Sequence, residues 1–226
     1  MKAWVFSDSH SQHWHLTPPT NCELVIHAGD ESNSNIPYQN EIECRDFLQW
    51  FSGLTIKHKV FTAGNHSAAI EKKLVTRKEI EDMGIHYLEH EYLDLAGKRF
   101  FGSPYTPTFG NWYFMKSRET ISRYWDEVDE PLDVLITHGP PKSILDITTD
   151  RYGKTEHVGD SSLYKAVQRI KPRFHVFGHI HSNREGDINS GIFIPTGSPT
   201  TYCNVACVRD GEIGMGVINN GIIIDV

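Results

Sequence analysis

The amino-acid sequence predicts an α/β fold in which two mixed β-sheets pack face to face and helices cover both outer faces. Short uninterrupted apolar runs are typical of buried parallel strands, and apolar stripes with helical spacing indicate the helices. Hairpin signals in the second half add antiparallel strands. The 226 residues, 38% of them hydrophobic, suffice for one core and contain no linker or repeat, so we expect a single domain over residues 1–226.

The clearest strands are three apolar runs, Ala3 to Phe6, Leu24 to Ile26 and Val134 to Ile136. None of them alternates between apolar and polar residues, so both faces of each strand are expected to be buried. Shorter apolar runs also end at Gly64 and Gly178. These runs predict the parallel part of the sheets.

Three further segments carry apolar residues at the i, i+3, i+4, i+7 spacing of one helix face. We interpret these stripes as faces that pack on the sheets rather than as cofactor contacts. Asn40 and Glu43 resemble a capping box and predict where the first helix starts. The stripes are Cys44, Phe47, Leu48 and Phe51; Ile121, Tyr124, Trp125 and Val128; and Leu163, Ala166, Val167 and Ile170 before Pro172.

Two hairpins are predicted from turn signals between strand-like runs. Tyr92 to Leu95 and Arg99 to Phe101 flank the sequence Ala-Gly-Lys. Near the end of the chain, Ile213 to Ile218 and Ile222 to Val226 flank Asn-Asn-Gly, a strong hairpin-turn signal. Both hairpins would contribute antiparallel strands.

The composition excludes several classes of protein. A net charge of −7 argues against a binder of long nucleic acid, whose affinity comes largely from Lys and Arg. No run approaches the length of a transmembrane helix, and the start lacks the apolar region of a signal peptide, so no membrane partner is expected. The 4 cysteines form no C-x-x-C pair, which favours free thiols in a reducing cytoplasm.

Residues that can bind metal ions follow directly after the ends of five apolar runs. In open α/β sheets, ligands bind beyond the carboxyl ends of the strands, so these side chains are expected to form one site. Asp8 and His10 are two apart and leave an extended backbone on the same side, as do His179 and His181. The remaining candidates are Asp30, Asn65 and His138.

Glycines adjoin these candidate ligands at four positions. Without a Cβ atom, a glycine lets the backbone approach a metal closely or turn sharply at the end of a strand. We therefore expect a role in the site for Gly29, Gly64, Gly139 and Gly178.

The types of ligand indicate the types of metal. Carboxylate and imidazole groups without thiolate suit divalent ions of manganese, iron or zinc, and two such ions about 3.5 to 4 Å apart can clamp a phosphoryl group. Two carboxylates against two divalent ions leave a net charge of about plus two, which suits an anionic substrate. The sequence therefore favours phosphoryl chemistry.

The order of the motifs resembles that of the calcineurin-like metallophosphoesterase superfamily: Asp-x-His, Gly-Asp, Gly-Asn-His, Thr-His-Gly and Gly-His-x-His. The segments 102–107, 137–141 and 173–177, together with Asn111 and Trp112, resemble its metallophosphoesterase-domain-containing branch. This resemblance implies a four-layer αββα sandwich. It also implies hydrolysis of small phosphodiesters, including cyclic nucleotides.

The resemblance also assigns the ligands to two divalent metal ions. Mn²⁺ is the favoured ion, with Fe, Zn, Co or Ni as alternatives. Asp30 would bridge the two ions. One ion would be held by Asp8, His10 and His181, and the other by Asn65, His138 and His179.

The expected mechanism is attack on phosphorus by a hydroxide that bridges the two ions. His66, next to Asn65 but on the other side of the chain, is the candidate general acid, which the resemblance supports. A purely structural histidine is the alternative interpretation. Many members of the family have an acidic residue after this histidine, whereas this chain has Ser67, which leaves the orientation of His66 open.

Substrate contacts are expected in the turn-rich segment 140–161 and near Asn111, because loops over a rigid sheet commonly determine specificity. The candidates are Asn111, Arg151 and His157, and ordinary solvated loop residues are the equal alternative. The function hypothesis is a phosphodiesterase with a small phosphodiester substrate. A phosphomonoesterase or protein phosphatase is the second hypothesis, and a non-catalytic metal-binding scaffold is the third.

Overall fold

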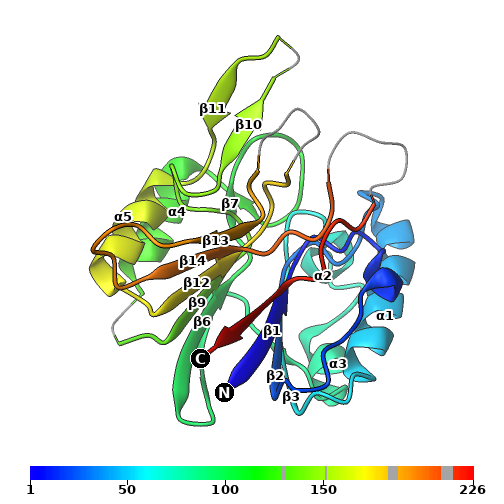
Figure 1. Ribbon diagram of the computed structural model, residues 1–226. Helices are drawn as coiled ribbons and strands as arrows, with labels where there is room; N and C mark the ends of the chain where they lie inside the picture. Colours follow the sequence, from blue (N-terminus) through cyan, green and yellow to red (C-terminus); the bar gives the residue numbers. More distant parts are fainter. Residues whose placement is uncertain (129–130, 151, 183–187, 210–215) are drawn as a thin grey trace.

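A computed structural model describes residues 1–226 apart from 129–130, 151, 183–187 and 210–215. Two mixed sheets pack face to face with helices on both outer sides, as predicted (Figure 1). The N-terminus and the C-terminus lie side by side, because the first and last strands pair with each other. The fold is therefore the four-layer α/β sandwich expected from the sequence.

The first sheet has five strands in the order β15-β1-β2-β3-β4. Strands β1 to β4 run parallel, and β15 is antiparallel to β1 at one edge. Their bounds are β1 Lys2–Phe6, β2 Leu24–Ala28, β3 His58–Thr62, β4 His86–Tyr87 and β15 Ile222–Asp225.

The second sheet has six strands in the order β13-β14-β12-β9-β6-β5. Its four central strands are parallel, and β5 and β13 are antiparallel edge strands. The bounds are β5 Glu91–Leu95, β6 Lys98–Ser103, β9 Val134–Thr137, β12 Phe174–Phe177, β13 Gly191–Phe193 and β14 Thr201–Asn204.

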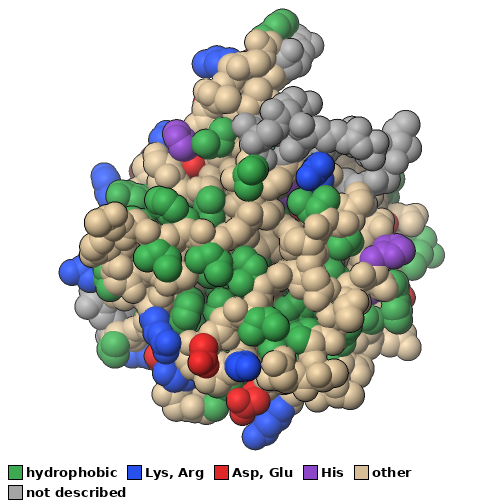
Figure 2. All heavy atoms as spheres, in the orientation of Figure 1, with side chains coloured by type: hydrophobic (Ala, Val, Ile, Leu, Met, Phe, Trp, Pro, Cys, Tyr) green, Lys and Arg blue, Asp and Glu red, His purple; other side chains and the backbone are tan. Residues whose placement is uncertain are grey.

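Two smaller ladders lie near the carboxyl ends of the parallel strands. The parallel pair β7 (Thr106–Pro107) and β8 (Met115–Lys116) brackets a loop at residues 108–114. The antiparallel hairpin of β10 (Ile147–Thr149) and β11 (Thr155–His157) projects from the body of the molecule (Figures 1 and 2).

The core is divided by the sheets into three layers of buried side chains. In β1, Ala3 and Val5 face the second sheet, whereas Trp4 and Phe6 pack against helix α1 (Pro37–Ser52). Phe100 and Val134 complete the central layer from the other sheet. The third layer lies between the second sheet and helices α4 (Arg118–Asp126) and α5 (Ser161–Ile170). Strands buried on both faces explain why their sequences do not alternate.

The three predicted helices are confirmed as α1, α4 and α5. The described residues also contain a 3₁₀ turn at His13–His15 and two short helices, α2 (Ala68–Glu71) and α3 (Arg77–Asp82). Helix α3 begins with a capping box of Thr76 and Glu79, a signal that was present in the sequence. No described helix has the length and apolarity needed to cross a membrane.

The predicted start of α1 was wrong. The helix begins at Pro37, whose fixed backbone angle suits the first helical turn. Asn40 is instead buried within the helix, where its amide donates to the Ser34 and His66 carbonyls. Glu43 accepts hydrogen bonds from the backbone of the preceding segment 33–34. These two side chains therefore hold neighbouring loops rather than the helix end.

The first predicted hairpin is confirmed, but the second pairing was wrong for the residues that the structure describes. Strand β15 pairs with β1 and not with residues 216–218; residues 213–215 lie outside the described residues. Asn219 and Asn220 explain the difference. The Asn219 amide donates to the Ala206 carbonyl, and the Asn220 carbonyl accepts from the Trp4 indole. The turn is thus bonded to other parts of the core.

A buried histidine in the first layer predicts a pH-dependent stability. Burial among Phe6, Phe47 and Phe61 lowers the pKa of His27 to about 3, and neither ring nitrogen has a hydrogen-bond partner. Between the ordinary pKa of 6.5 and about 3, the unfolded chain binds a proton that the folded chain excludes. Stability from this residue is therefore lost as the pH falls through that range.

His27→Phe should remove this loss, which amounts to about 2 kcal/mol between pH 7 and pH 5. The measurement is urea unfolding at both pH values in the presence of chelator. Parallel pH profiles for the wild-type chain and the variant would contradict the expected role of His27.

Candidate metal centre

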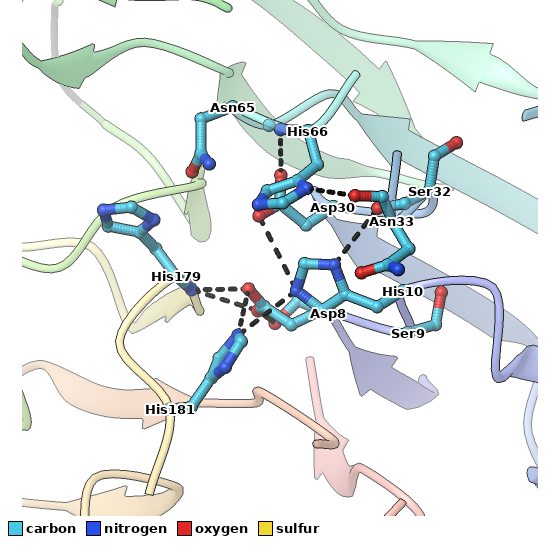
Figure 3. A network of polar contacts seen from close by, with 12 residues as sticks. Asp8, Ser9, His10, Asp30, Ser32, Asn33, Asn65, His66, His179 and His181 are labelled. Carbon is cyan, nitrogen blue, oxygen red and sulfur yellow. Dashed lines mark hydrogen bonds and ion pairs between the residues drawn. The ribbon is translucent and has the colours of Figure 1, made fainter. Parts of the chain in front are cut away.

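The structure brings all eight motif residues predicted for the metal site and its acid to one place. They follow the carboxyl ends of β1, β2, β3, β9 and β12, and Figure 3 shows the labelled site residues gathered around a common centre. These are the edges at which parallel sheets bind ligands. The residues are Asp8 and His10 after β1, Asp30 after β2, Asn65 and His66 after β3, His138 after β9, and His179 and His181 after β12.

Asp8, His10 and His181 form the first cluster, with ligand atoms within 4.8 Å of one another. His181 Nε2 lies 3.1 Å from Asp8 Oδ1 and 3.4 Å from His10 Nε2. This is the predicted set for one ion. His10 Nδ1 faces the Ser32 carbonyl at 3.1 Å, which directs Nε2 toward the cluster.

The second cluster contains Asp30, His138 and His179. His138 Nε2 lies 3.2 Å from Asp30 Oδ2 and 2.8 Å from Asn65 Oδ1, so the predicted amide ligand is also in place. The same Asp30 oxygen lies 3.9 Å from His10 Nε2 of the first cluster. Asp30 is therefore placed between the two clusters.

The donor set fits two divalent ions. Ligand atoms that share one ion at roughly 2.0 to 2.2 Å lie about 3 to 3.5 Å apart, close to the separations seen in both clusters. Neutral imidazoles with free lone pairs are required, and burial lowers the pKa of His10 to about 4 and that of His179 to about 3. Imidazole and carboxylate donors without thiolate suit manganese, iron or zinc.

The carboxylates of the site are held in their charged form. Burial raises the pKa of Asp8, but the hydrogen bond with His181 and the charges of His181 and His138 together outweigh it and leave the pKa well below the usual range. Burial likewise opposes the charge of Asp30, and His138 lowers its pKa. For His138, burial lowers the pKa, but the charge and the hydrogen bond of Asp30 raise it to about 9. A cation bound here would displace the His138 proton.

Four of the candidate ligands have left-handed backbone angles, which residues other than glycine rarely adopt. The φ values are 51° for Asp8, 40° for His10, 59° for Asp30 and 70° for His179. Such strain costs energy and clusters at functional sites. The extended backbone expected at these ligand pairs was therefore wrong for Asp8, His10 and His179, because the chain turns directly after each strand.

The glycines beside the ligands allow close approach of the chain, as predicted. A Cβ on Gly64 would meet the Asp30 carboxylate, and one on Gly178 would meet the side chains of Asp8 and Ser7. Gly29 has a φ of 102°, which favours glycine. A Cβ on Gly139 would lie 3.1 Å from the nearest atom, so the need for glycine is weaker at this position.

Gly178→Ala should weaken metal binding by roughly 10- to 100-fold, because the added methyl group displaces the Asp8 carboxylate from its cluster. Gly216→Ala is the matched control, since a Cβ there meets no atom within 4 Å. Calorimetric titration of metal-free protein with Mn²⁺ is the measurement. Equal affinities in the two variants would contradict the expected displacement.

His66 lies beside a metal ligand and an aromatic ring. Its ring is 4.6 Å from that of His10 and 4.4 Å from the half-buried Trp112. Its Nδ1 faces the Asn33 carbonyl at 2.8 Å, which orients the ring and directs Nε2 to the site (Figure 3). A ring nitrogen of His66 also lies within 4.8 Å of ligand atoms of His10 and Asp30, so His66 adjoins both clusters.

Ser67 has a different part in the site. Its hydroxyl donates to Glu31 Oε2 at 2.6 Å and accepts from the Gly64 amide at 2.8 Å. Glu31 is fully buried, and burial raises its pKa to about 7. Glu31, the residue after Asp30, is therefore the acidic group that Ser67 contacts. Glu31 supports the turn that carries Asn65 and His66.

The predicted substrate contacts have three different outcomes. His157 lines a cleft of about 610 Å³ that also borders His179. Asn111 is exposed on the loop 108–114, two residues from Phe109 of the same cleft. Arg151 lies outside the described residues.

Sequence reasoning missed the groups that surround the metal ligands. Phe109 packs on His179, with 5.1 Å between ring centroids, and Trp112 packs on His66. Asp146 is fully buried and holds His157 Nδ1 at 2.5 Å. Isolated aromatic or acidic residues in loops carry no periodic signal. Of these residues, only Trp112 had a signal, as part of the family resemblance.

Comparisons with known proteins agree with this geometry. The family profile described as calcineurin-like phosphoesterase matches residues 1–183. Metallophosphoesterase domain-containing protein 1 of Homo sapiens is 29% identical over 97% of this chain and 69% of its own length. A UPF0046 protein of Caenorhabditis elegans is 30% identical over 94% of this chain and 71% of its own length.

Solved structures show the same fold. A crystal structure of a Thermus thermophilus protein, TT1561, aligns with a TM-score of 0.56 at 10% identity, over 90% of this chain and 88% of its own. Another crystal structure aligns with a TM-score of 0.63 at 15% identity, over 90% of this chain and 89% of its own. At these identities the likeness concerns the fold alone.

Proposed function

This chain belongs to the calcineurin-like phosphoesterase family, and we propose that it is a phosphodiesterase that uses two divalent metal ions to hydrolyse a small phosphodiester. The family implies a hydrolase of phosphoric esters. The observation that carries the proposal is the position of Asp30. Its Oδ2 atom lies 3.2 Å from His138 Nε2 of one cluster and 3.9 Å from His10 Nε2 of the other.

When bound, two divalent ions supply Lewis acidity, which polarises a phosphoryl group and lowers the pKa of water toward neutrality. The chain supplies the fixed geometry. Asp8, His10 and His181 would hold one ion, with Mn²⁺ the favoured metal. Asn65, His138 and His179 would hold the other, and Asp30 would contact both. Five of these side chains are buried, which limits the access of bulk water to their ligand atoms: Asp8, His10, Asp30, Asn65 and His138.

His66 is the proposed proton donor to the leaving alkoxide. Its Nδ1 is engaged by the Asn33 carbonyl, so the proton would leave from Nε2. The Trp112 ring covers one face and limits the rotation of the imidazole. His66 is half-buried, so its outer edge remains open to a substrate. These contacts supply the orientation that the family's acidic residue would otherwise provide.

The two flanks of the metal clusters favour a diester over a monoester. Trp112 and His66 border one side, while the cleft lined by Phe109 and His157 borders His179 on the other. A diester has two organic groups and can use both sides, whereas a monoester has one. All four cysteines are free thiols, which suits the proposed cytoplasmic location.

The test compares hydrolysis of bis(p-nitrophenyl) phosphate and p-nitrophenyl phosphate, with Mn²⁺ and with chelator. We expect metal-dependent turnover that prefers the diester and disappears in Asp30→Ala. A preference for the monoester would favour a phosphomonoesterase. Absence of turnover with Mn²⁺, Fe²⁺, Zn²⁺, Co²⁺ or Ni²⁺ would favour a metal-binding scaffold.

A further inference from the structure

His66 belongs to a third group of side chains whose ligand atoms lie close enough to share one metal ion. One ligand atom each from His10, Asp30 and His66 lies within 4.8 Å of the other two. His10 Nε2 lies 3.9 Å from Asp30 Oδ2, and the ring centroids of His10 and His66 are 4.6 Å apart. Figure 3 shows the three side chains next to one another. His10 and Asp30 also belong to the two clusters described above, so His66 is the member that this group adds.

The hydrogen bond of the His66 ring gives it the arrangement of a metal ligand. Its Nδ1 faces the Asn33 carbonyl at 2.8 Å, and because a carbonyl only accepts, Nδ1 carries a hydrogen. In the neutral ring, Nε2 therefore carries the lone pair. The candidate ligand His10 is arranged in the same way, with Nδ1 facing the Ser32 carbonyl at 3.1 Å. Donation from one ring nitrogen to a backbone carbonyl is typical of a histidine whose other nitrogen binds a metal.

Asp30 holds His66 beside the ligand atoms. Its Oδ1 accepts from the His66 backbone amide at 2.7 Å, while its Oδ2 faces His10. Ligand atoms that share one ion lie about 3 to 3.5 Å apart, so closing this group around an ion requires a movement of roughly 1 Å. The half-buried His66 ring is the member with room for such a movement, because His10 and Asp30 are buried.

The third group cannot be filled independently of the first cluster. Both use Nε2 of His10, and one lone pair binds one ion. The group is therefore an alternative position for the ion of the first cluster and not a place for a third ion. The first cluster is the tighter of the two, since His181 Nε2 lies 3.1 Å from Asp8 Oδ1 and 3.4 Å from His10 Nε2. An ion is expected there whenever its ligands are complete.

We propose that the first metal ion has an alternative binding position, formed by His10, Asp30 and His66, which it occupies when the first cluster does not hold it. An ion in this position takes up the Nε2 lone pair, so His66 no longer carries the proton for the leaving group. Metal binding and proton donation by His66 thus exclude each other. The position itself stands on metal binding alone, whereas its effect on proton donation rests on the proposed function.

The test weakens each position separately and then both together. His181→Ala removes a ligand of the first cluster. His66→Phe removes the nitrogens of the alternative position and keeps a ring against Trp112. Calorimetric titration of metal-free protein with Mn²⁺ is the measurement. His66→Phe should leave the Mn²⁺ affinity of the otherwise wild-type chain nearly unchanged, and should lower it by roughly 100-fold or more in the His181→Ala background.

His15→Asn in the His181→Ala background is the matched control, because His15 is an exposed histidine on the 3₁₀ turn. It should bind Mn²⁺ as tightly as His181→Ala alone. Crystals of Mn²⁺-loaded His181→Ala provide a second readout from a single substitution. Anomalous scattering should locate one ion about 2.0 to 2.2 Å from His66 Nε2.

The effect on proton donation is measured with two substrates in His181→Ala. A 3′,5′-cyclic nucleotide has an alkoxide leaving group that needs a proton, whereas methyl p-nitrophenyl phosphate releases a stable anion. With Mn²⁺ bound through His66, turnover of the cyclic diester relative to the nitrophenyl ester should fall by roughly 10-fold or more from the wild-type ratio. Because a ratio is measured, a general loss of metal-dependent activity cancels.

The outcomes separate the inference from the proposed function. Equal effects of His66→Phe on Mn²⁺ affinity in the two backgrounds would overturn the alternative position, and so would an ion beyond bonding distance of His66 Nε2 in the His181→Ala crystals. An unchanged ratio of the two rates would overturn the effect on proton donation. Absence of turnover of both esters by the wild-type protein would refute the proposed function, and the Mn²⁺ affinities would still decide the alternative position.

Discussion

Replacing Asp30 by asparagine is expected to lower metal-dependent turnover by roughly 10³-fold or more and to reduce bound metal to at most one ion per chain. Asparagine keeps the shape of the side chain, and its carbonyl oxygen can still accept from the His66 amide. The change therefore removes the charge and little else. Asp30 is the one carboxylate placed between the clusters in the described part of the chain, so no other group there can replace it.

Metal content by mass spectrometry and turnover of a diester are the two measurements. Asp225→Asn is the control for loss of a carboxylate, because the Asp225 side chain is 76% exposed and contacts only the N-terminus in the described ion pairs. Two bound ions together with wild-type turnover in Asp30→Asn would refute the placement of Asp30 between the metals.

The ligand positions could be predicted because two independent rules agree on them. Apolar runs identify buried parallel strands, and parallel sheets bind ligands at the carboxyl ends of their strands. His138 illustrates the point, since nothing near it in sequence is a ligand, yet the run Val134–Ile136 places it at the same edge as Asp30. The short motifs therefore predict a site only in combination with the strands that precede them. Local sequence was sufficient for this part of the site.

Orientation could not be predicted, because it depends on contacts between residues far apart in the sequence. His66 is oriented by the carbonyl of Asn33, which lies 33 positions earlier. The hydroxyl of Ser67 reaches Glu31 across 36 positions. A backbone carbonyl has no residue identity that a motif could record. The departure at Ser67 left the orientation of His66 open, and only the three-dimensional structure shows that the Asn33 carbonyl faces its ring.

The prediction of strand pairing at the C-terminus was wrong for a related reason. The Asn-Asn-Gly signal reports that the chain turns, but not which strand receives the one that follows. The pairing is decided by the free edge of β1 and by the fit of Ile224 against the central layer. Those depend on the completed sheet. The misplaced start of α1 has the same origin, since Asn40 bonds to the His66 carbonyl in the site rather than to its own helix.

His66→Asn is expected to separate metal binding from acid catalysis. The variant should retain its metal ions, because His66 is not needed in the two proposed ligand sets. Its turnover of a diester with an alkoxide leaving group, probed with a 3′,5′-cyclic nucleotide, should fall by roughly 10²-fold or more. Turnover of methyl p-nitrophenyl phosphate should fall much less, since nitrophenolate is a stable anion that leaves without a proton.

The contrast between leaving groups distinguishes a proton donor from a residue that only supports the site. Loss of support would slow both substrates equally, whereas loss of the donor slows the alkoxide selectively. His15→Asn, at an exposed histidine on the 3₁₀ turn, should change neither rate. Equal losses for the two substrates would assign His66 to positioning. In that case the contacts with Trp112 and Asn33 would serve the metal ligands, and the leaving group would take its proton from solvent.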